Sequence, residues 1–201
     1  YWVKEAIECM LGKKVFYNHS SKSLRDFGSC ALGRLPSRCS DPCQTSSEGL
    51  FKTFLPLHSM RVLDLFSGSG CIGVAVLKYV PQAHVDFGEK ERKLLSQIRL
   101  NAKRNGIAKT RYRVIQTDLF SGVKGRYNYI FANPPYIAES RKSKVQRSVV
   151  RHEPKEALFA GKDGLDIIYP FLRQAKDFLS ERGIVYLEFD SFQKSKIEKL
   201  L

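Results

Sequence analysis

Between residues 61 and 73 the chain reads RVLDLFSGSGCIG. Residues 61–65 form an apolar run of strand length, and residues 72–79 have the spacing of a helix. Between them, Gly68, Gly70 and Gly73 have the spacing of the glycine turns that join a strand to a helix at dinucleotide-binding sites. Glycine in such a turn lets the backbone approach a ligand closely. The segment therefore predicts a strand, a turn and a helix that border a binding site.

Short apolar runs alternate with helical patterns through the rest of the chain after residue 60. We expect strands and helices in alternation, over His84–Gly88, Arg92–Asn105, Tyr112–Gln116, Tyr127–Ala132, Gly164–Leu179 and Ile184–Phe189. This alternation predicts an α/β fold in which helices cover a doubly wound, mostly parallel sheet over residues 60–201. Residues 1–59 are expected to form an irregular N-terminal segment and linker, because residues 20–47 are rich in Ser, Cys, Pro and Gly.

The composition narrows the class of protein. The chain has 201 residues, enough for one domain with a buried core, and no apolar stretch long enough to cross a bilayer, so we expect no membrane partner. Its five cysteines are an odd number without a CxxC pair, and none of its four histidines has metal-like companions. We therefore expect neither a disulfide framework nor a metal site. The net charge of +14 favours polyanionic partners or surroundings.

An acidic residue, Glu89, follows the glycine turn by about 20 residues and ends the second predicted strand. A carboxylate at this place accepts hydrogen bonds from the hydroxyls of a ribose. Together with Gly68 and Gly70 it predicts an adenosine-containing cofactor. The two signals leave open whether this cofactor is a nicotinamide dinucleotide or S-adenosylmethionine.

The fourth predicted strand runs directly into Asn133-Pro134-Pro135-Tyr136. The prolines fix a turn just beyond the carboxyl end of a central strand, where open α/β sheets bind ligands. The loop resembles the Asn/Asp-Pro-Pro-Tyr/Phe loop of S-adenosylmethionine-dependent methyltransferases that modify planar amino groups. The Asn133 side-chain oxygen and the Pro134 carbonyl are acceptors for the two N–H groups of such an NH₂, and Tyr136 can pack against its flat face. We therefore expect residues 133–136 to be catalytic.

A longer segment, residues 152–165, reads HEPKEALFAGKDGL. It resembles the (Tyr/His)-Glu-Pro-x-x-Ala-Leu-x-x-Gly-x-Asp-Gly-Leu segment of the HemK/PrmC family, glutamine methyltransferases that act on peptide chain release factors. Residues 188–193, EFDSFQ, resemble that family's Glu-Ile-Gly-x-x-Gln, with Asp190 in place of the glycine, and residues 10–16 resemble its Leu-Gly-x-x-x-Phe. The resemblance thus extends from about Cys9 to Gln193.

This resemblance implies a Rossmann-like class I methyltransferase fold, S-adenosylmethionine as cofactor and a set of cofactor-binding residues. In the family an acid at the position of Asp64 lies near the methionine ammonium group, and one at the position of Asp118 accepts from the adenine amine, flanked by apolar neighbours. From the residues alone, Asp64 can equally brace a loop or cap a helix, and Asp118 can be a turn residue. The expected cofactor-binding residues are Asp64, Phe66, Gly68, Gly70, Glu89, Asp118, Leu119 and Asn133.

The sequence also departs from the family pattern. The Ile-Pro-Arg-x-Glu-Thr element that precedes the first strand is not found in residues 18–50, and neither the family's N-terminal helical domain nor its last two strands are present. We therefore expect a fragment, truncated at both ends. The basic run of residues 141–151 either steers an anionic partner or is a solvated loop.

The leading hypothesis is methyl transfer from S-adenosylmethionine to the side-chain amide of the glutamine in the Gly-Gly-Gln motif of a release factor. Three alternatives stay open: an adenine-amine methyltransferase of DNA or RNA, a nicotinamide oxidoreductase, which would leave Asn133–Tyr136 unexplained, and a remnant that binds a partner without turnover. Two features favour a mitochondrial location over the cytosol: the basic composition, and the sequence of residues 85–90, VDFGEK, which is similar to that of fungal organellar members of the HemK/PrmC family.

Overall fold

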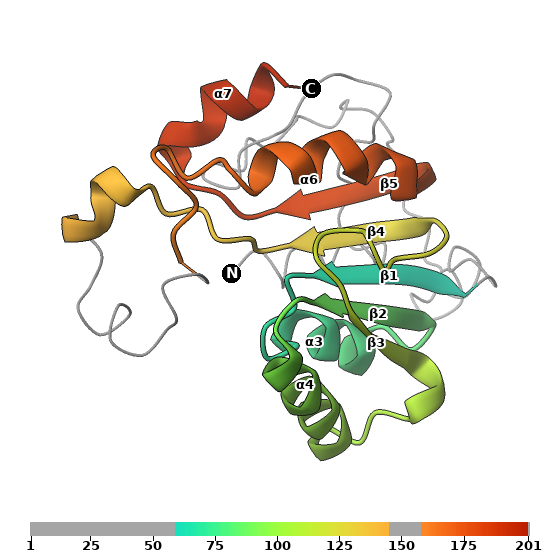
Figure 1. Ribbon diagram of the computed structural model, residues 1–201. Coiled ribbons are helices and arrows are strands. Elements are labelled where there is room, and N and C mark those ends of the chain that lie inside the picture. Colours follow the sequence, from blue (N-terminus) through green and yellow to red (C-terminus); the bar gives the residue numbers. More distant parts are fainter. Residues whose placement is uncertain (1–58, 145–157, 201) are drawn as a thin grey trace, which may run out of the picture.

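The computed structural model describes residues 59–144 and 158–200, and the structural statements that follow concern this part of the chain. It contains a sheet of five parallel strands in the order β3-β2-β1-β4-β5 (Figure 1). The strands are β1 Met60–Leu65, β2 Ala83–Glu89, β3 Tyr112–Gln116, β4 Tyr127–Ala132 and β5 Leu179–Leu187. The predicted α/β fold with a doubly wound sheet is confirmed. The predicted irregular segment 1–59 lies, apart from Ser59, outside the described residues.

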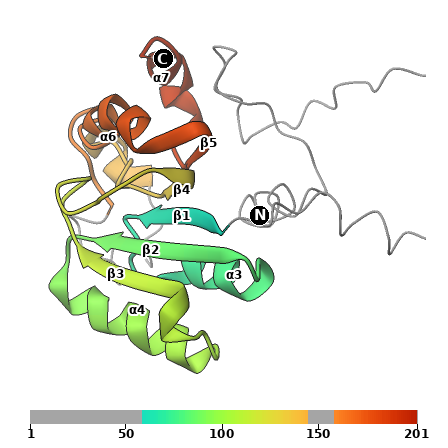
Figure 2. The same ribbon diagram turned by 90° about the vertical axis from the view of Figure 1, so that its right-hand side faces the viewer.

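Helices cover both faces of this sheet. The helices are α3 Cys71–Tyr79, α4 Arg92–Arg104, α6 Ile168–Ala175 and α7 Lys194–Glu198, with 3-10 turns η1 Lys109–Arg111, η2 Glu139–Lys144, η4 Lys176–Phe178 and η5 Ser191–Gln193. In both ribbon views α3 and α4 lie beside β1, β2 and β3, whereas α6 and α7 lie beside β4 and β5 (Figures 1 and 2). The order of elements therefore places two helices on each side of the strand-order reversal between β1 and β4.

The core has two apolar layers, one on each face of the sheet, because successive side chains of strand β1 point to opposite faces. Val62 packs with residues of α3 and α4, including Val76 and Ile98, whereas Leu63 packs with residues of α6, including Phe171. All five side chains are fully buried. The two apolar layers hold the sheet between its helices and fix the carboxyl ends of the strands in one row.

Two elements, β5 and α6, differ from the sequence prediction by more than one residue. Strand β5 begins at Leu179 instead of Ile184 and ends at Leu187 instead of Phe189. Its pairing with β4 shifts register between Tyr127 and Tyr129, and a Cβ at Gly183 would lie 2.8 Å from the Tyr127 carbonyl oxygen. Helix α6 begins at Ile168 instead of Gly164, because Gly164 has a φ of 76° that a helix does not accommodate.

Candidate active site

The predicted site residues gather at one edge of the sheet, beyond the carboxyl ends of its strands. The turn at Phe66–Gly70 follows β1, Glu89 ends β2, Asp118 and Leu119 follow β3, and Asn133–Tyr136 follows β4. Strands β1 and β4 are neighbours whose chain connections lead to opposite sides of the sheet. This is the switch point at which open α/β sheets bind ligands. The topology therefore brings the predicted residues from four strands to one edge.

The glycines after β1 have different structural roles. Gly68 and Gly70 both lie in the left-handed region, with φ values of 55° and 77°. A Cβ at Gly70 would lie 3.1 Å from Ile98, and one at Gly73 would overlap the Phe87 ring, so these two glycines let α3 pack closely on β2 and α4. A Cβ at Gly68 would meet no atom within 4 Å. Gly68 is thus the glycine that leaves open space beside the turn.

Glu89 connects this turn to the end of β2. Its carboxylate is 7% exposed and accepts hydrogen bonds from the Gly68 N–H at 2.7 Å and the Glu91 N–H at 2.8 Å. Each oxygen of an ionised carboxylate has about two acceptor sites, so each retains one for a further donor. A buried acceptor pair beside the open space at Gly68 fits the ribose hydroxyls of an adenosine cofactor. The residues present therefore suit the cofactor that the sequence predicts.

Asp64 is the second buried acid of the site. Its side chain accepts a hydrogen bond from the Gly73 N–H at 2.9 Å, which braces the first turn of α3 against β1. Burial raises the pKa of Asp64 to about 7, against the effect of the Gly73 hydrogen bond and with a further contribution from the negative charge of Glu89. The structure thus shows the loop-bracing role, one of the two interpretations that the sequence left open. The proposed contact with a methionine ammonium group stays a prediction.

The turn after β3 holds two further predicted residues. Asp118 is largely exposed and forms an ion pair with Lys90 at 2.7 Å. Leu119 is half-buried and has a φ of 51°, a value that non-glycine residues rarely adopt. Phe66 after β1 has a similar φ of 60°. Two strained non-glycine residues at neighbouring strand ends are typical of functional sites.

Thr117, which the sequence analysis did not select, maintains this turn. Its buried hydroxyl donates to the Leu119 carbonyl at 2.9 Å and accepts from the Gly122 N–H at 2.9 Å. A threonine after a strand is common in turns, so its position alone carried no specific signal. Its role is to fix the conformation that Leu119 adopts.

The loop after β4 presents one exposed amide. Asn133 is exposed, Pro134 is buried, and Pro135 and Tyr136 are half-buried. No other residue of 59–144 and 158–200 donates a hydrogen bond to the Asn133 side-chain oxygen or to the Pro134 carbonyl. Within the described chain both acceptors are unoccupied, and their contact with a substrate amide stays a prediction.

The Tyr136 side chain is fixed by β5. Its ring packs against the apolar layer under α6, and its hydroxyl donates to Glu188 Oε1 at 3.0 Å. The Glu188 N–H also donates to the Ala132 carbonyl at 2.9 Å, just before the loop. Contact of Tyr136 with a substrate stays a prediction, whereas its bond to the residue after β5 is a structural finding.

Gln193 holds the same loop from behind, and the sequence analysis did not select it as a site residue. It is fully buried, and its Nε2 donates to the carbonyls of Tyr136 and Asp163, both at 2.9 Å. Its Oε1 accepts from the Asp190 N–H at 2.9 Å. One side chain thus joins the loop after β4, the segment before α6 and the segment after β5. The only signal was its place in the EFDSFQ segment that resembles the HemK/PrmC family.

The described part of the family-like segment 152–165 lies against the continuation of this loop. Ile137 donates its N–H to the Leu158 carbonyl at 2.9 Å and accepts from the Ala160 N–H at 3.1 Å. Gly164 faces the Tyr136 carbonyl so closely that any Cβ would overlap it. Residues 152–157 lie outside the described residues. The two segments that carried the resemblance therefore meet at the loop.

The basic run of residues 141–151 is described only in part. Arg141 forms an ion pair with Asp190 at 3.3 Å, and its guanidinium lies 4.6 Å from the centre of the Phe192 ring. This contact joins η2 to the segment after β5. The side chains of the other basic residues in the run lie outside the described residues.

Residues 59–144 and 158–200 contain neither a metal-binding cluster nor a membrane-spanning helix. No group of three or more His, Cys, Asp or Glu side chains is arranged to hold a metal ion. None of the helices there has the length and apolar character needed to span a bilayer.

Comparison with known proteins agrees with this geometry. The chain is 35% identical over 128 residues to the ribosomal protein uL3 glutamine methyltransferase of Neisseria meningitidis serogroup A, which covers 64% of this chain and 42% of that protein. It is 34% identical over 130 residues to the release factor glutamine methyltransferase of Deinococcus radiodurans, which covers 65% and 45%. The chain spans between about a quarter and a half of the length of its curated relatives.

A solved structure and a family model agree on the fold. A crystal structure of ribosomal protein L11 methylase from Lactobacillus delbrueckii subsp. bulgaricus matches with a TM-score of 0.51 and 22% identity, over 73% of this chain and 60% of that one. The model of the methyltransferase small domain matches residues 39–161, more than half of the chain. The chain therefore belongs to the methyltransferase small domain family, and S-adenosylmethionine is its methyl donor.

Proposed function

We propose that this chain transfers a methyl group to the side-chain amide nitrogen of a protein glutamine, the one in the Gly-Gly-Gln motif of a peptide chain release factor. The observation that carries the proposal is the pair of acceptors at Asn133 and Pro134, which accept no hydrogen bond from the described residues and lie directly after β4, the neighbour of the strand that leads into the Gly68 turn. Relatives named release factor glutamine methyltransferases support the substrate class. A related observation favours a second substrate, because other relatives are named for ribosomal protein uL3.

The acceptor pair suits an amide substrate for a chemical reason. An amide nitrogen is a poor nucleophile because its lone pair is delocalised into the carbonyl. S-adenosylmethionine supplies a methyl group bonded to a positively charged sulfur. The amide nitrogen forms a bond to this methyl carbon while the carbon–sulfur bond breaks, and the sulfur leaves as a neutral thioether. The Asn133 oxygen and the Pro134 carbonyl can each accept one N–H of the NH₂, which fixes the nitrogen and orients it. No general base is needed before transfer, because alkylation makes the nitrogen acidic enough to release a proton afterwards.

The two prolines and the anchoring of Tyr136 give the loop the rigidity that this positioning requires. Pro134 and Pro135 restrict the backbone directly, and Glu188 and Gln193 fix Tyr136 at its hydroxyl and at its carbonyl. Positioning of reacting groups loses its effect when the geometry relaxes by about 1 Å. The contacts behind the loop therefore support a catalytic role for Asn133 and Pro134.

The test is transfer of labelled methyl groups by the full chain. S-adenosylmethionine labelled on the methyl is incubated with release factors of the bacterial and the cytosolic type, with uL3, and with each substrate carrying Ala in place of the target Gln. We expect label on one release factor and none on its Gln→Ala form. Label on uL3 alone would select the second substrate, and label on adenine in added DNA or RNA would reject glutamine as acceptor. Cofactor binding without any transfer would identify a remnant that binds a partner.

The same experiment addresses the compartment. We propose a mitochondrial location, supported by the strongly basic composition. Transfer to the bacterial type of release factor, the organellar type, is the expected result, and transfer to the cytosolic type alone would contradict it.

A further inference from the structure

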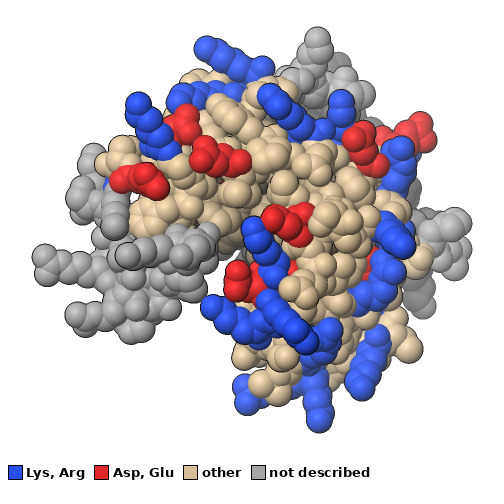
Figure 3. All heavy atoms as spheres, in the orientation of Figure 1, with Lys and Arg blue, Asp and Glu red and all other residues tan. Residues whose placement is uncertain are grey.

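The outward face of α4 carries positive charge that forms no ion pair with any described acid. The helix contains no Asp or Glu, and its apolar stripe, Leu95, Ile98 and Ala102, is buried against the sheet. Its exposed basic residues are Arg92, Lys93, Arg99, Lys103 and Arg104. They extend over roughly 18 Å of helix at 1.5 Å per residue. In Figure 3 Lys and Arg gather over the lower part of the molecule, where Figure 1 shows α4.

None of these five basic residues forms an ion pair with another described residue, in contrast to several basic residues elsewhere. Lys90 pairs with Asp118, Arg113 with Asp86, and Lys196 with Asp163. No described acid lies within ion-pair distance of the five residues on α4. An anion that binds there competes with no ion pair among the described residues.

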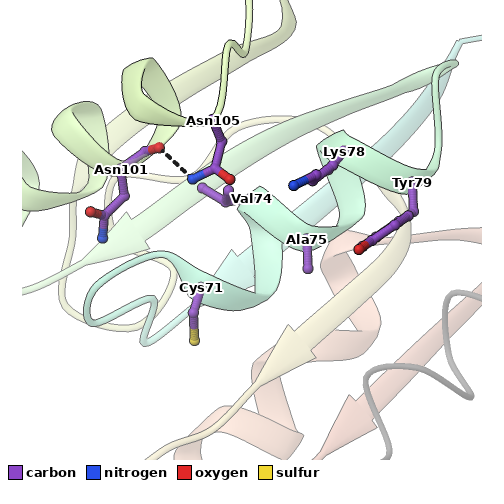
Figure 4. Close-up of a pocket in the computed structure, with 7 residues that line it drawn as sticks. All are labelled: Cys71, Val74, Ala75, Lys78, Tyr79, Asn101 and Asn105. Carbon is purple, nitrogen blue, oxygen red and sulfur yellow. Dashed lines mark hydrogen bonds between the residues drawn. The ribbon is translucent and has the colours of Figure 1, made fainter.

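A surface hollow of about 320 Å³ lies beside this face, between α3 and α4 (Figure 4). Val74 and Ala75 of α3 give it an apolar wall, and Lys78 and Tyr79 lie at the end of the same helix. Tyr79 is 57% exposed, so the face of its ring is accessible from solvent. The hollow therefore combines an exposed aromatic ring with a nearby ammonium group.

Asn105 closes the hollow from the side of α4. Its Nδ2 donates to the Asn101 carbonyl at 2.9 Å, and no residue of the described chain donates to its side-chain oxygen. Both polar atoms of the Asn101 side chain already have partners, because its Nδ2 donates to the Ser69 carbonyl and its Oδ1 accepts from Gln97. Asn105 thus offers an acceptor at one end of the hollow, with Tyr79 at the other end (Figure 4), and an acceptor suits the edge of a planar base.

We propose that this surface binds single-stranded RNA, with phosphates along α4 and an unpaired base on Tyr79 in the hollow. Arg and Lys rows bind phosphates, and an aromatic side chain stacks on any base with its flat face free. Unpaired bases available for stacking occur chiefly in RNA loops and ends. A membrane fits less well, because the apolar face of α4 is buried and Leu100 is the exposed large apolar residue on this helix.

The test measures binding of the full chain to a fluorescent 12-nucleotide single-stranded RNA by fluorescence anisotropy. It is done at several salt concentrations and without S-adenosylmethionine, so that no methyl transfer takes place. The triple variant Arg99→Glu/Lys103→Glu/Arg104→Glu should bind at least tenfold more weakly. Loss of three phosphate contacts should also reduce the slope of log K against log salt by about 2, since each contact contributes about 0.7 on a single strand. Tyr79→Ala should weaken binding about fivefold or more. Because binding is read directly, its failure is distinct from failure of the methyl-transfer proposal.

A charge-matched control separates a site from general attraction. Lys176, Arg182 and Lys199 are exposed and lie on η4, β5 and the end of α7, at the opposite side of the sheet. Their reversal to Glu changes the net charge equally and should lower affinity by less than threefold. Arg99→Gln/Lys103→Gln/Arg104→Gln gives a milder variant should the Glu triple fail to fold. Equal losses in both triples would overturn the proposal, as would stronger binding to duplex RNA, to single-stranded DNA or to phosphatidylserine vesicles than to the single strand.

Discussion

The buried amide of Gln193 donates a hydrogen bond of 2.9 Å to the main-chain carbonyl of Tyr136, 57 residues earlier in the chain. Gly164 makes this contact possible, because a Cβ at that position would overlap the Tyr136 carbonyl. The loop that contains Asn133 is therefore positioned by the segment after β5 as well as by its own prolines. A residue without substrate contact can thus control the rate by holding the loop.

Gln193→Ala should lower both stability and rate. The change leaves the carbonyls of Tyr136 and Asp163 and the Asp190 N–H without their partner, which costs about 2 to 3 kcal/mol. We expect kcat to fall at least tenfold, while the Kd for S-adenosylmethionine changes less than threefold. Urea unfolding, titration of the cofactor and single-turnover methyl transfer measure the three quantities.

Gln174→Ala serves as the control for this prediction. Gln174 is half-buried on α6 and donates to the carbonyl of Pro170 in its own helix. Its loss should cost about 0.5 kcal/mol or less and leave the rate unchanged. Equal unfolding curves and equal rates for wild type and Gln193→Ala would show that other contacts hold the loop.

Asn133→Ala should separate catalysis from folding. The side chain is exposed and no other described residue bonds its oxygen, so the free energy of unfolding should change by about 0.5 kcal/mol or less. The rate of methyl transfer should fall about a hundredfold, as when other enzymes lose one group that orients or stabilises the reacting atoms. Steady-state kinetics together with calorimetric titration of the cofactor tests this. A parallel loss of cofactor affinity would place Asn133 on the cofactor instead of the amide.

The glycine turn offers a matched pair of substitutions. Gly73→Ala forces a Cβ into the Phe87 ring and within 2.9 Å of Val85, so it should destabilise the fold by about 2 kcal/mol or more. Gly68→Ala meets no atom within 4 Å and should cost only about 1 kcal/mol for its positive φ. Its methyl group occupies the open space beside Glu89, so we expect at least tenfold weaker cofactor binding. Thermal unfolding and cofactor titration of both variants distinguish packing from ligand contact, and unchanged affinity in Gly68→Ala would remove that glycine from the binding site.

Much of the fold could be predicted because its strands are short apolar runs bounded by polar or glycine turns. The predicted bounds of β3 and β4 agree with the structure at both ends, and those of β1 differ by one residue. The start of β5 could not be found in the same way. Residues 180–183 read SERG, a polar sequence that breaks the apolar pattern, yet they continue the strand next to β4 through a register shift. Backbone pairing at an edge strand leaves no periodic side-chain signal.

In the site, too, some contacts could be predicted from the sequence and others could not. The contact between Gly68 and Glu89 follows from spacing and topology, because the ends of neighbouring parallel strands meet at one edge. The role of Gln193 could not be derived from residue types, because its three partners are main-chain groups in separate segments. Any sequence supplies such groups, so only the fold shows which ones meet. The ion pair of Asp118 with Lys90 has the same origin.

Asp64 makes stability depend on pH in a direction opposite to that of most acids. Burial raises its pKa in the folded chain to about 7, from the value of about 4 that is usual for an aspartate. Between these values the folded protein holds a proton that the unfolded chain has released, so the contribution of Asp64 to stability is complete below about pH 4 and is lost as the pH rises to about 7. At about 1.4 kcal/mol per pKa unit, the loss amounts to up to ~4 kcal/mol. Asp64→Asn retains an acceptor for the Gly73 N–H and removes the titration.

The stability of Asp64→Asn relative to wild type should therefore increase steadily between pH 5 and pH 7.5 in the absence of cofactor. Urea unfolding at four pH values measures this difference, and all other carboxylates cancel because both proteins contain them. Glu89→Gln provides a second comparison: it removes the negative charge that raises the pKa of Asp64, so the decline should end at a lower pH. Parallel pH profiles for wild type and Asp64→Asn would show that the buried carboxyl is ionised throughout, with its charge stabilised by the N–H groups at the start of α3.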